Sequence, residues 1–158
     1  MGHLLIFGLG YTAGRIAAAM RDAGWQVRAT GSAGDIAFAD REAVLAALGE
    51  ASHILSSVPP DRTSGGDPVL DAYGEALRGR PLFYLSSTGV YGDRAGAWVD
   101  EATPTIAQSG EGRRNARAEA DLAWLNLGAR VFRLPGIYGR GRSVRDRVRE
   151  GTARRIDL

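Results

Sequence analysis

The chain has 158 residues, of which 44% are hydrophobic and 24% charged, as in a globular domain that can bury a core. It contains no cysteine and two histidines, which excludes disulfides and thiolate chemistry and argues against a zinc site, so we expect no bound metal. Its 20 basic residues, all arginine, stand against 18 acidic ones for a net charge of +2, which argues against nucleic acid as a partner and excludes any mechanism that requires lysine.

Short apolar runs and helix-favouring segments alternate along the chain. The first run, 3–7, is far too short for a signal sequence or a membrane span, so we expect a cytoplasmic protein with no membrane partner. Six segments are predicted as strands: 3–7, 26–30, 36–38, 53–58, 82–87 and 130–134. Helices are predicted between them at 15–24, 41–48, 68–77 and 113–127. This alternation predicts an α/β fold, a Rossmann-like doubly wound parallel sheet with helices on both faces.

A glycine-rich turn joins the first predicted strand to the first predicted helix. Gly8-x-Gly10-x-x-Ala13 matches the dinucleotide-binding fingerprint, with alanine in the third position. Gly8 allows the tight turn, Gly10 lets the backbone approach a pyrophosphate, and Ala13 lets the helix pack close to the sheet. A glycine-rich turn in an unrelated α/β domain is the alternative. We predict cofactor contacts from the residues of this turn: Gly8, Gly10, Tyr11, Thr12 and Ala13.

The end of the second predicted strand bears on which dinucleotide is bound. An acidic residue that binds the ribose hydroxyls is expected there, but the nearest acid is Asp35. Thr30 and Ser32 can instead donate hydrogen bonds to a 2′-phosphate, and Arg28 lies two residues before Thr30. We therefore predict NAD or NADP as the cofactor, with a slight preference for NADP, and contacts from Thr30 and Ser32.

The fourth predicted strand ends at a pair of prolines. Pro59 and Pro60 cannot continue a β-ladder, so the strand stops at Val58. Ligands of doubly wound sheets bind outside the carboxyl ends of the strands, where the strand order reverses. We therefore expect Val58 and Pro59 to lie along the cofactor.

Three further motifs follow in order along the chain. They are LSSTGVYGD at 85–93, WVDE at 98–101 and RLPGIYGRGR at 133–142. With the glycine turn, they resemble the extended short-chain dehydrogenase/reductase superfamily, and within it the NAD-dependent epimerase/dehydratase group, whose members act mostly on nucleotide-linked sugars. The resemblance covers the whole chain and implies an NAD(P) cofactor and a nucleotide sugar, or a similar carbonyl or hydroxyl compound, as substrate. The short spacing between the second and fourth predicted strands suggests a vestigial third strand.

The superfamily uses a serine, a tyrosine and a lysine in its chemistry. The resemblance places the active serine at Ser87, four residues before Tyr91, where the serine would orient the substrate oxygen. A serine that only hydrogen-bonds a turn is the alternative. Tyr91 and Tyr138 are candidates for a replacement acid, and packing or substrate contact is the other role open to both.

The tyrosine and lysine of the superfamily have no counterpart here. The resemblance places either Glu111 and Asn115 or Arg113 and Arg117 in the two positions. An arginine keeps its charge and does not readily release a proton, so Arg117 is predicted to hold ribose or phosphate oxygens of the cofactor. The standard proton-transfer pair is therefore absent.

The end of the chain is basic, with seven arginines and three acidic residues in 140–158. Members of the superfamily usually continue well beyond this point. We therefore expect an NAD(P)-binding domain over 1–140 and, over 141–158, the start of a missing or reduced C-terminal substrate lobe. Three arginines around this boundary would meet a substrate diphosphate: Arg140, Arg142 and Arg145. A solvated helix over 144–150 with intrahelical Arg–acid pairs is the alternative.

Two functions are compatible with these patterns, and whether the chain is an enzyme stays open at this point. The first is a nicotinamide-dependent epimerase, dehydratase or reductase that acts on a small molecule such as a nucleotide sugar. The second is a non-catalytic dinucleotide-binding or sensing module that lacks the Tyr-x-x-x-Lys pair. In either case we expect a homodimer that binds cofactor and shows weak oxidoreductase activity on generic substrates of the superfamily.

Overall fold

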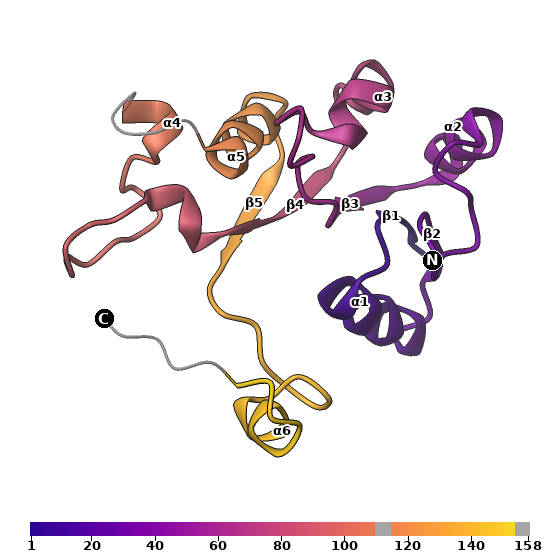
Figure 1. Ribbon diagram of the computed structural model, residues 1–158. Helices are drawn as coiled ribbons and strands as arrows, with labels where there is room; N and C mark the ends of the chain where they lie inside the picture. Colours follow the sequence, from indigo (N-terminus) through magenta and orange to yellow (C-terminus); the bar gives the residue numbers. More distant parts are fainter. Residues whose placement is uncertain (110–114, 154–158) are drawn as a thin grey trace.

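The computed structural model describes residues 1–109 and 115–153 and is built on one parallel sheet (Figure 1). Its strands are β1 (His3–Phe7), β2 (Gln26–Ala29), β3 (His53–Ser56), β4 (Leu82–Ser87) and β5 (Arg130–Leu134). They lie in the order β2-β1-β3-β4-β5, and each neighbouring pair runs parallel. The chain order reverses between β1 and β3, which is the switch point where ligands of such sheets bind.

Helices cover both faces of this sheet (Figure 1). The helices that pack on it are α1 (Tyr11–Asp22), α2 (Arg41–Glu50), α3 (Pro68–Leu77) and α5 (Ala116–Asn126). α1 lies on one face, whereas α2, α3 and α5 lie on the other. The predicted doubly wound α/β fold is therefore confirmed.

Three short helices complete the described structure. The 3₁₀ turn η1 (Thr88–Tyr91) and α4 (Ile106–Ser109) follow β4 and have no counterpart in the sequence-based prediction. α6 (Val144–Arg149) forms where a solvated helix was one of the two expectations, and Val144 and Val148 on it are exposed. In the part of the chain that the structure describes, no helix is long and apolar enough to cross a membrane.

The predicted strand at 36–38 does not form, and what remains of it is a single β-bridge, as expected for a vestigial third strand. In this segment, only Ile36 forms an isolated bridge, to Thr30, and the residues after it do not join the sheet. The N–H groups of Asp35 and Ile36 both donate to the carbonyl of Ala29, at 3.0 and 3.1 Å. The chain turns back so tightly after β2 that too few extended residues remain for a strand.

Several element boundaries also differ from the prediction. α1 begins at Tyr11 rather than at residue 15, so its first turn lies inside the glycine fingerprint. β3 ends at Ser56, two residues earlier than expected. α5 begins at Ala116 because the side chain of Asn115 caps it, and residues 113 and 114 lie outside the described part of the chain.

Two apolar clusters fill the space on either side of the sheet. On the side of α2, α3 and α5, the buried rings of Tyr84 and Trp124 stack with their centroids 5.2 Å apart. On the other side, Ala13 and Ala17 of α1 are buried against the sheet. Small side chains at these positions let α1 approach β1 closely, which is the packing that the fingerprint requires at its third position.

The α1 side of β3, β4 and β5 carries a stack of rings. Centroid distances are 5.9 Å from His53 to Phe83 and 6.4 Å from Phe83 to Phe132. An apolar cavity of about 360 Å³ lies between these rings and α1. Phe132, at its border, is 48% exposed.

Candidate functional site

A cleft of about 300 Å³ opens at the carboxyl edge of the sheet, beside the N-terminus of α1. It is lined by the glycine turn, by the last residues of β4 and β5, by the segments that follow β3 and β5, and by α5. The lining residues are Gly10, Tyr11, Thr12, Ala13, Ser57, Pro59, Leu85, Ser86, Ser87, Arg117, Leu134, Pro135, Ile137 and Arg142. Seven of the residues predicted for the site are thus brought together: Gly10, Tyr11, Thr12, Ala13, Pro59, Ser87 and Arg117.

Gly8 shapes the turn at the floor of this site. Its φ is +81°, and a Cβ there would lie 2.9 Å from Cγ2 of Val58, so both backbone conformation and packing require glycine. The Ser57 hydroxyl donates to the Gly8 carbonyl at 2.6 Å, and the Gly8 N–H donates to Thr30 Oγ1 at 3.3 Å. The residues that directly follow β2 and β3 therefore stabilise the glycine turn by hydrogen bonds.

Gly10 is the N-cap of α1 and faces open space. A Cβ at this position would meet no protein atom within 4 Å, so packing inside the chain leaves room for a side chain. Glycine has no side chain to cap the first turn, and the first N–H groups of the helix stay available to a ligand. A helix N-terminus of this kind favours an anion such as phosphate.

The charged residues of the cleft also favour an anion. Arg117 of α5 and Arg142 both line it, whereas no acidic side chain from residues 1–109 or 115–153 does. Two guanidinium groups and the positive end of α1 therefore converge on one small volume, which suits a ligand with several negative charges.

Four predicted cofactor contacts do not line the cleft: Gly8, Thr30, Ser32 and Val58. Thr30 is 1% exposed, and its hydroxyl oxygen accepts the Gly8 N–H, so the residue stabilises the turn. Val58 packs where a Cβ of Gly8 would come. Ser32 is exposed on the loop after β2.

The acid nearest the end of β2 is already engaged. Asp35 accepts the Ala29 N–H at 2.7 Å and Arg28 Nε at 2.8 Å. Partial burial raises the pKa of Asp35, but these hydrogen bonds outweigh it and hold the pKa below its usual value. Asp35 is therefore an ionised partner of Arg28, and neither group is free at the end of the strand.

Ser87 lies at the end of β4 and lines the cleft. Its Oγ accepts the Gly89 N–H at 3.2 Å and so caps η1. The hydroxyl hydrogen is still available, because this contact uses only a lone pair of the oxygen. Ser87 can therefore donate to a ligand while it caps the turn.

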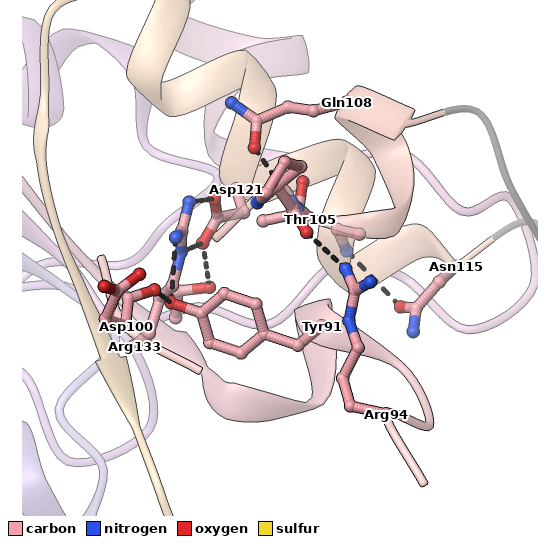
Figure 2. A network of polar contacts seen from close by, with 11 residues as sticks. Tyr91, Arg94, Asp100, Thr105, Gln108, Asn115, Asp121 and Arg133 are labelled. Atoms are coloured by element: carbon pink, nitrogen blue, oxygen red, sulfur yellow. Dashed lines mark hydrogen bonds and ion pairs between the residues drawn. The ribbon is translucent and has the colours of Figure 1, made fainter. Parts of the chain in front are cut away.

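Tyr91 lies in a buried polar network (Figure 2). Its hydroxyl donates to the Asp100 carbonyl at 2.8 Å and accepts from Arg133 Nη1 at 3.0 Å, and the residue is 6% exposed. Arg133 also donates to both carboxylate oxygens of Asp121, at 2.9 and 3.2 Å, and Asp121 accepts the Ser86 hydroxyl at 2.6 Å. The structure thus places the proton of Tyr91 in an internal hydrogen bond, outside the lining of the cleft.

The ion pair between Asp121 and Arg133 stabilises the charged form of both side chains. The carboxylate of Asp121 is fully buried, and its hydrogen bonds with Arg133 raise the pKa of that guanidinium. Arg133 opens the RLPG motif, so the arginine of this motif joins β5 to α5 and η1.

The two alternatives for the tyrosine and lysine positions differ in what the structure shows. Glu111 and Arg113 lie outside the described residues. Asn115 caps α5 by accepting the N–H groups of Arg117 and Ala118, at 2.9 and 3.3 Å (Figure 2). Arg117, the second residue of α5, lines the cleft.

Tyr138, the other candidate for an acid, is 85% exposed and is not part of the lining. The sequence-based prediction did not include six of the lining residues, all of which lie near or just after the carboxyl ends of strands: Ser57, Leu85, Ser86, Leu134, Pro135 and Ile137. The available signal was the rule that strand ends border the crevice, applied to β3, β4 and β5 alike. Arg142 was expected to meet a substrate, whereas the structure places it beside the glycine turn.

Comparison with known proteins identifies similar structures, although no family model and no curated protein matches the sequence. A conserved protein of unknown function from Silicibacter pomeroyi is 37% identical over 100% of this chain and 61% of its own, with a TM-score of 0.77. A structure from Methylobacillus flagellatus, provisionally described as an NAD-dependent epimerase/dehydratase, is 24% identical over 92% of this chain and 59% of its own (TM-score 0.70). The enzyme WbmH of Bordetella bronchiseptica in complex with NAD⁺ is 17% identical over 96% of this chain and 63% of its own (TM-score 0.63). The chain spans about three fifths of the length of these structures.

Proposed function

We propose that this chain, which has the fold of the NAD-dependent epimerase/dehydratases of the short-chain dehydrogenase/reductase superfamily, binds NAD or NADP in the cleft beside α1. The observation that carries the proposal is the cleft itself. An uncapped helix N-terminus and two arginines line it, and no acidic side chain of the described residues does. A dinucleotide diphosphate matches this set of donors.

The residues present fit such a cofactor. The N–H groups that follow Gly10 would hold its phosphates, Pro59 would border it, and Arg117 would bind ribose or phosphate oxygens. A bound nicotinamide would supply hydride transfer. Ser87 would donate its hydroxyl hydrogen to a carbonyl or hydroxyl oxygen near that ring.

A preference for NADP over NAD is part of the proposal. A carboxylate at the end of β2 would bind the ribose hydroxyls and repel a 2′-phosphate. Asp35 is the nearest acid and is committed to Arg28 and Ala29, while Ser32 is exposed on the same loop. We expect a modestly lower dissociation constant for NADPH than for NADH.

Proton transfer is where the proposal departs from a standard enzyme of the superfamily. The hydroxyl of Tyr91 is held by Arg133 and Asp100, and the sequence contains no lysine. We therefore propose dinucleotide binding or sensing with weak turnover. A positioned general acid or base contributes about 10² to 10⁴ in rate, which is the loss to expect on generic substrates.

A second candidate function, turnover of a nucleotide sugar, is favoured by the position of Ser87 in the cleft. Substrate turnover at ordinary rates that is abolished by Ser87→Ala would establish this function. Cofactor binding without turnover would exclude it.

The experiment that tests cofactor binding is a fluorescence titration with NADH and NADPH of the unaltered chain, Gly10→Val and Gly49→Val. Both substitutions add a branched side chain where a Cβ meets no protein atom within 4 Å, so both variants should fold. Gly10→Val fills the place of the phosphates and should weaken binding at least tenfold, whereas Gly49→Val, on α2, should bind normally. Unchanged affinity in a folded Gly10→Val would refute the assignment of the cleft.

A further inference from the structure

The segment that follows β5 is tied to the first residue of α1. The Tyr11 hydroxyl donates to the Arg140 carbonyl at 3.1 Å, and Arg15 Nη2 donates to the same oxygen at 3.5 Å. Gly139 packs directly on this tyrosine, where a Cβ would collide with the hydroxyl. A segment from late in the chain therefore lies against the glycine turn.

This packing determines the position of Arg142. Gly139 and Arg142 exchange two backbone hydrogen bonds, of 3.1 and 2.8 Å, that close a tight turn. The guanidinium carbon of Arg142 lies 5.6 Å from the ring centroid of Tyr11, within reach of a cation–π interaction. The side chain lines the cleft next to the residues that begin α1, and it is exposed.

The charge of Arg142 has no acidic partner among the residues that the structure describes. Within residues 1–109 and 115–153, Arg142 makes no salt bridge, and the ring of Tyr11 carries a second guanidinium, that of Arg15, at 4.7 Å. Two like charges on one ring repel each other, and an anion between them would relieve this repulsion. The arrangement favours a ligand with more than one negative charge.

We propose that Arg142 binds the diphosphate of the dinucleotide together with the N–H groups of α1. This inference rests on the proposed function, because it needs a dinucleotide in the cleft. The planar donor fork of arginine matches two phosphate oxygens, and the turn at Gly139 holds its backbone in place. Arg142 is thus a cofactor-binding residue that lies outside the glycine fingerprint.

The test compares Arg142→Gln with Arg149→Gln in the full chain. Each removes one charge from an exposed side chain near the end of the chain, but Arg149 lies on α6 and does not line the cleft. Dissociation constants for NADPH, NADH and ADP-ribose are measured by calorimetry at several salt concentrations. We expect Arg142→Gln to weaken all three about tenfold or more, the loss of a charge-assisted hydrogen bond, and to flatten the salt dependence. Arg149→Gln should match the unaltered chain.

Each outcome separates this inference from the proposed function. If the unaltered chain binds none of the three ligands, the proposed function fails. If it binds them and Arg142→Gln binds equally tightly, or Arg149→Gln loses as much, the role of Arg142 is wrong and dinucleotide binding stands. Arg142→Lys keeps the charge but lacks the planar donor fork, so it should retain part of the affinity for the dinucleotide. If Arg142→Gln is unstable, Arg142→Lys tests the same role.

A nucleotide sugar is the other source of a diphosphate. UDP-glucose is therefore titrated in the absence of dinucleotide against the same variants. A loss of UDP-glucose affinity in Arg142→Gln, with NADPH affinity unchanged, would assign Arg142 to a substrate diphosphate and overturn the inference.

Discussion

Arg133 shows how a single residue of a recognisable motif can serve the fold. It opens the RLPG segment, and its guanidinium contacts Asp121 on α5 and Tyr91 at the end of η1 (Figure 2). These contacts join three elements behind Ser86 and Ser87, at the end of β4 that borders the cleft. Arg133 therefore stabilises the wall of the site and leaves the contact with ligand to other residues.

The ion pair between Asp121 and Arg133 yields a prediction for stability. Asp121→Asn should lower the free energy of unfolding by about 3 kcal/mol or more, because removal of one partner leaves the other charge uncompensated in a largely buried place. Denaturant unfolding measures this loss. Glu75→Gln is the control, since its pair with Arg78 is exposed and should contribute little. Equal losses in the two variants would show that burial of the pair is unimportant.

Tyr84 yields a prediction for the pH dependence of stability. Burial raises its pKa to about 12 from 10.0, with Asp67 adding to the shift and Arg117 opposing it. The unfolded chain therefore loses this proton first as the pH rises. Stability from this group is fully present below about pH 10 and declines between pH 10 and pH 12.

The measurement is alkaline unfolding of the unaltered chain, Tyr84→Phe and Tyr138→Phe. Tyr84→Phe should lose less stability above pH 10 than the unaltered chain. Tyr138→Phe changes a residue that is 85% exposed, so this variant should lose as much stability as the unaltered chain. An alkaline decline that is identical in all three would contradict the assignment to Tyr84.

Caps distinguish the helices at the scale of secondary-structure elements. Asp40, Asp67 and Asn115 cap α2, α3 and α5 through side-chain oxygens that accept backbone N–H groups. α1 begins instead with Gly10, which has no side chain. In α2, α3 and α5 the first N–H groups are thus satisfied by the helix's own cap, whereas α1 leaves these groups to a ligand.

Asp67 should be the more costly of two aspartate caps to remove. Its Oδ1 accepts the N–H groups of Val69 and Leu70, at 2.9 and 3.1 Å, and its Oδ2 accepts Trp124 Nε1 at 2.8 Å. Asp67→Ala should cost about 2 kcal/mol or more, because the buried indole N–H is left unpaired. Asp40→Ala removes one exposed cap bond and should cost about 1 kcal/mol. Thermal or denaturant unfolding compares them, and a larger loss in Asp40→Ala would contradict the ranking.

The site belongs to the whole molecule, because its lining comes from segments far apart in the sequence. The strand order β2-β1-β3-β4-β5 brings the ends of β1, β3, β4 and β5 to one edge, and α5 adds Arg117 (Figure 1). The segment after β5 then returns to Tyr11 and carries Arg142 to the glycine turn. The positive charge of Arg142, near the end of the chain, thus lies beside α1, the first helix.

The sequence by itself determined the fold class, most of the strands and the position of the glycine turn. These features depend on local patterns: apolar runs, helix-favouring segments and the spacing of Gly8, Gly10 and Ala13. The same patterns overestimated the segment 36–38, because a strand also needs a neighbour, and the turn closed by the Ala29 carbonyl removes the extended residues that could pair.

Only the tertiary structure decided which polar side chains face the cleft. Thr30 and Tyr91 carry hydroxyls suited to a ligand, but partners from distant elements, Gly8 for one and Arg133 for the other, engage them first. Arg142 reaches the glycine turn because Tyr11 holds the segment after β5. A hydrogen bond or charge contact depends on distances between segments that the spacing of residues along the chain does not encode, and these distances arise only when the sheet and its helices pack.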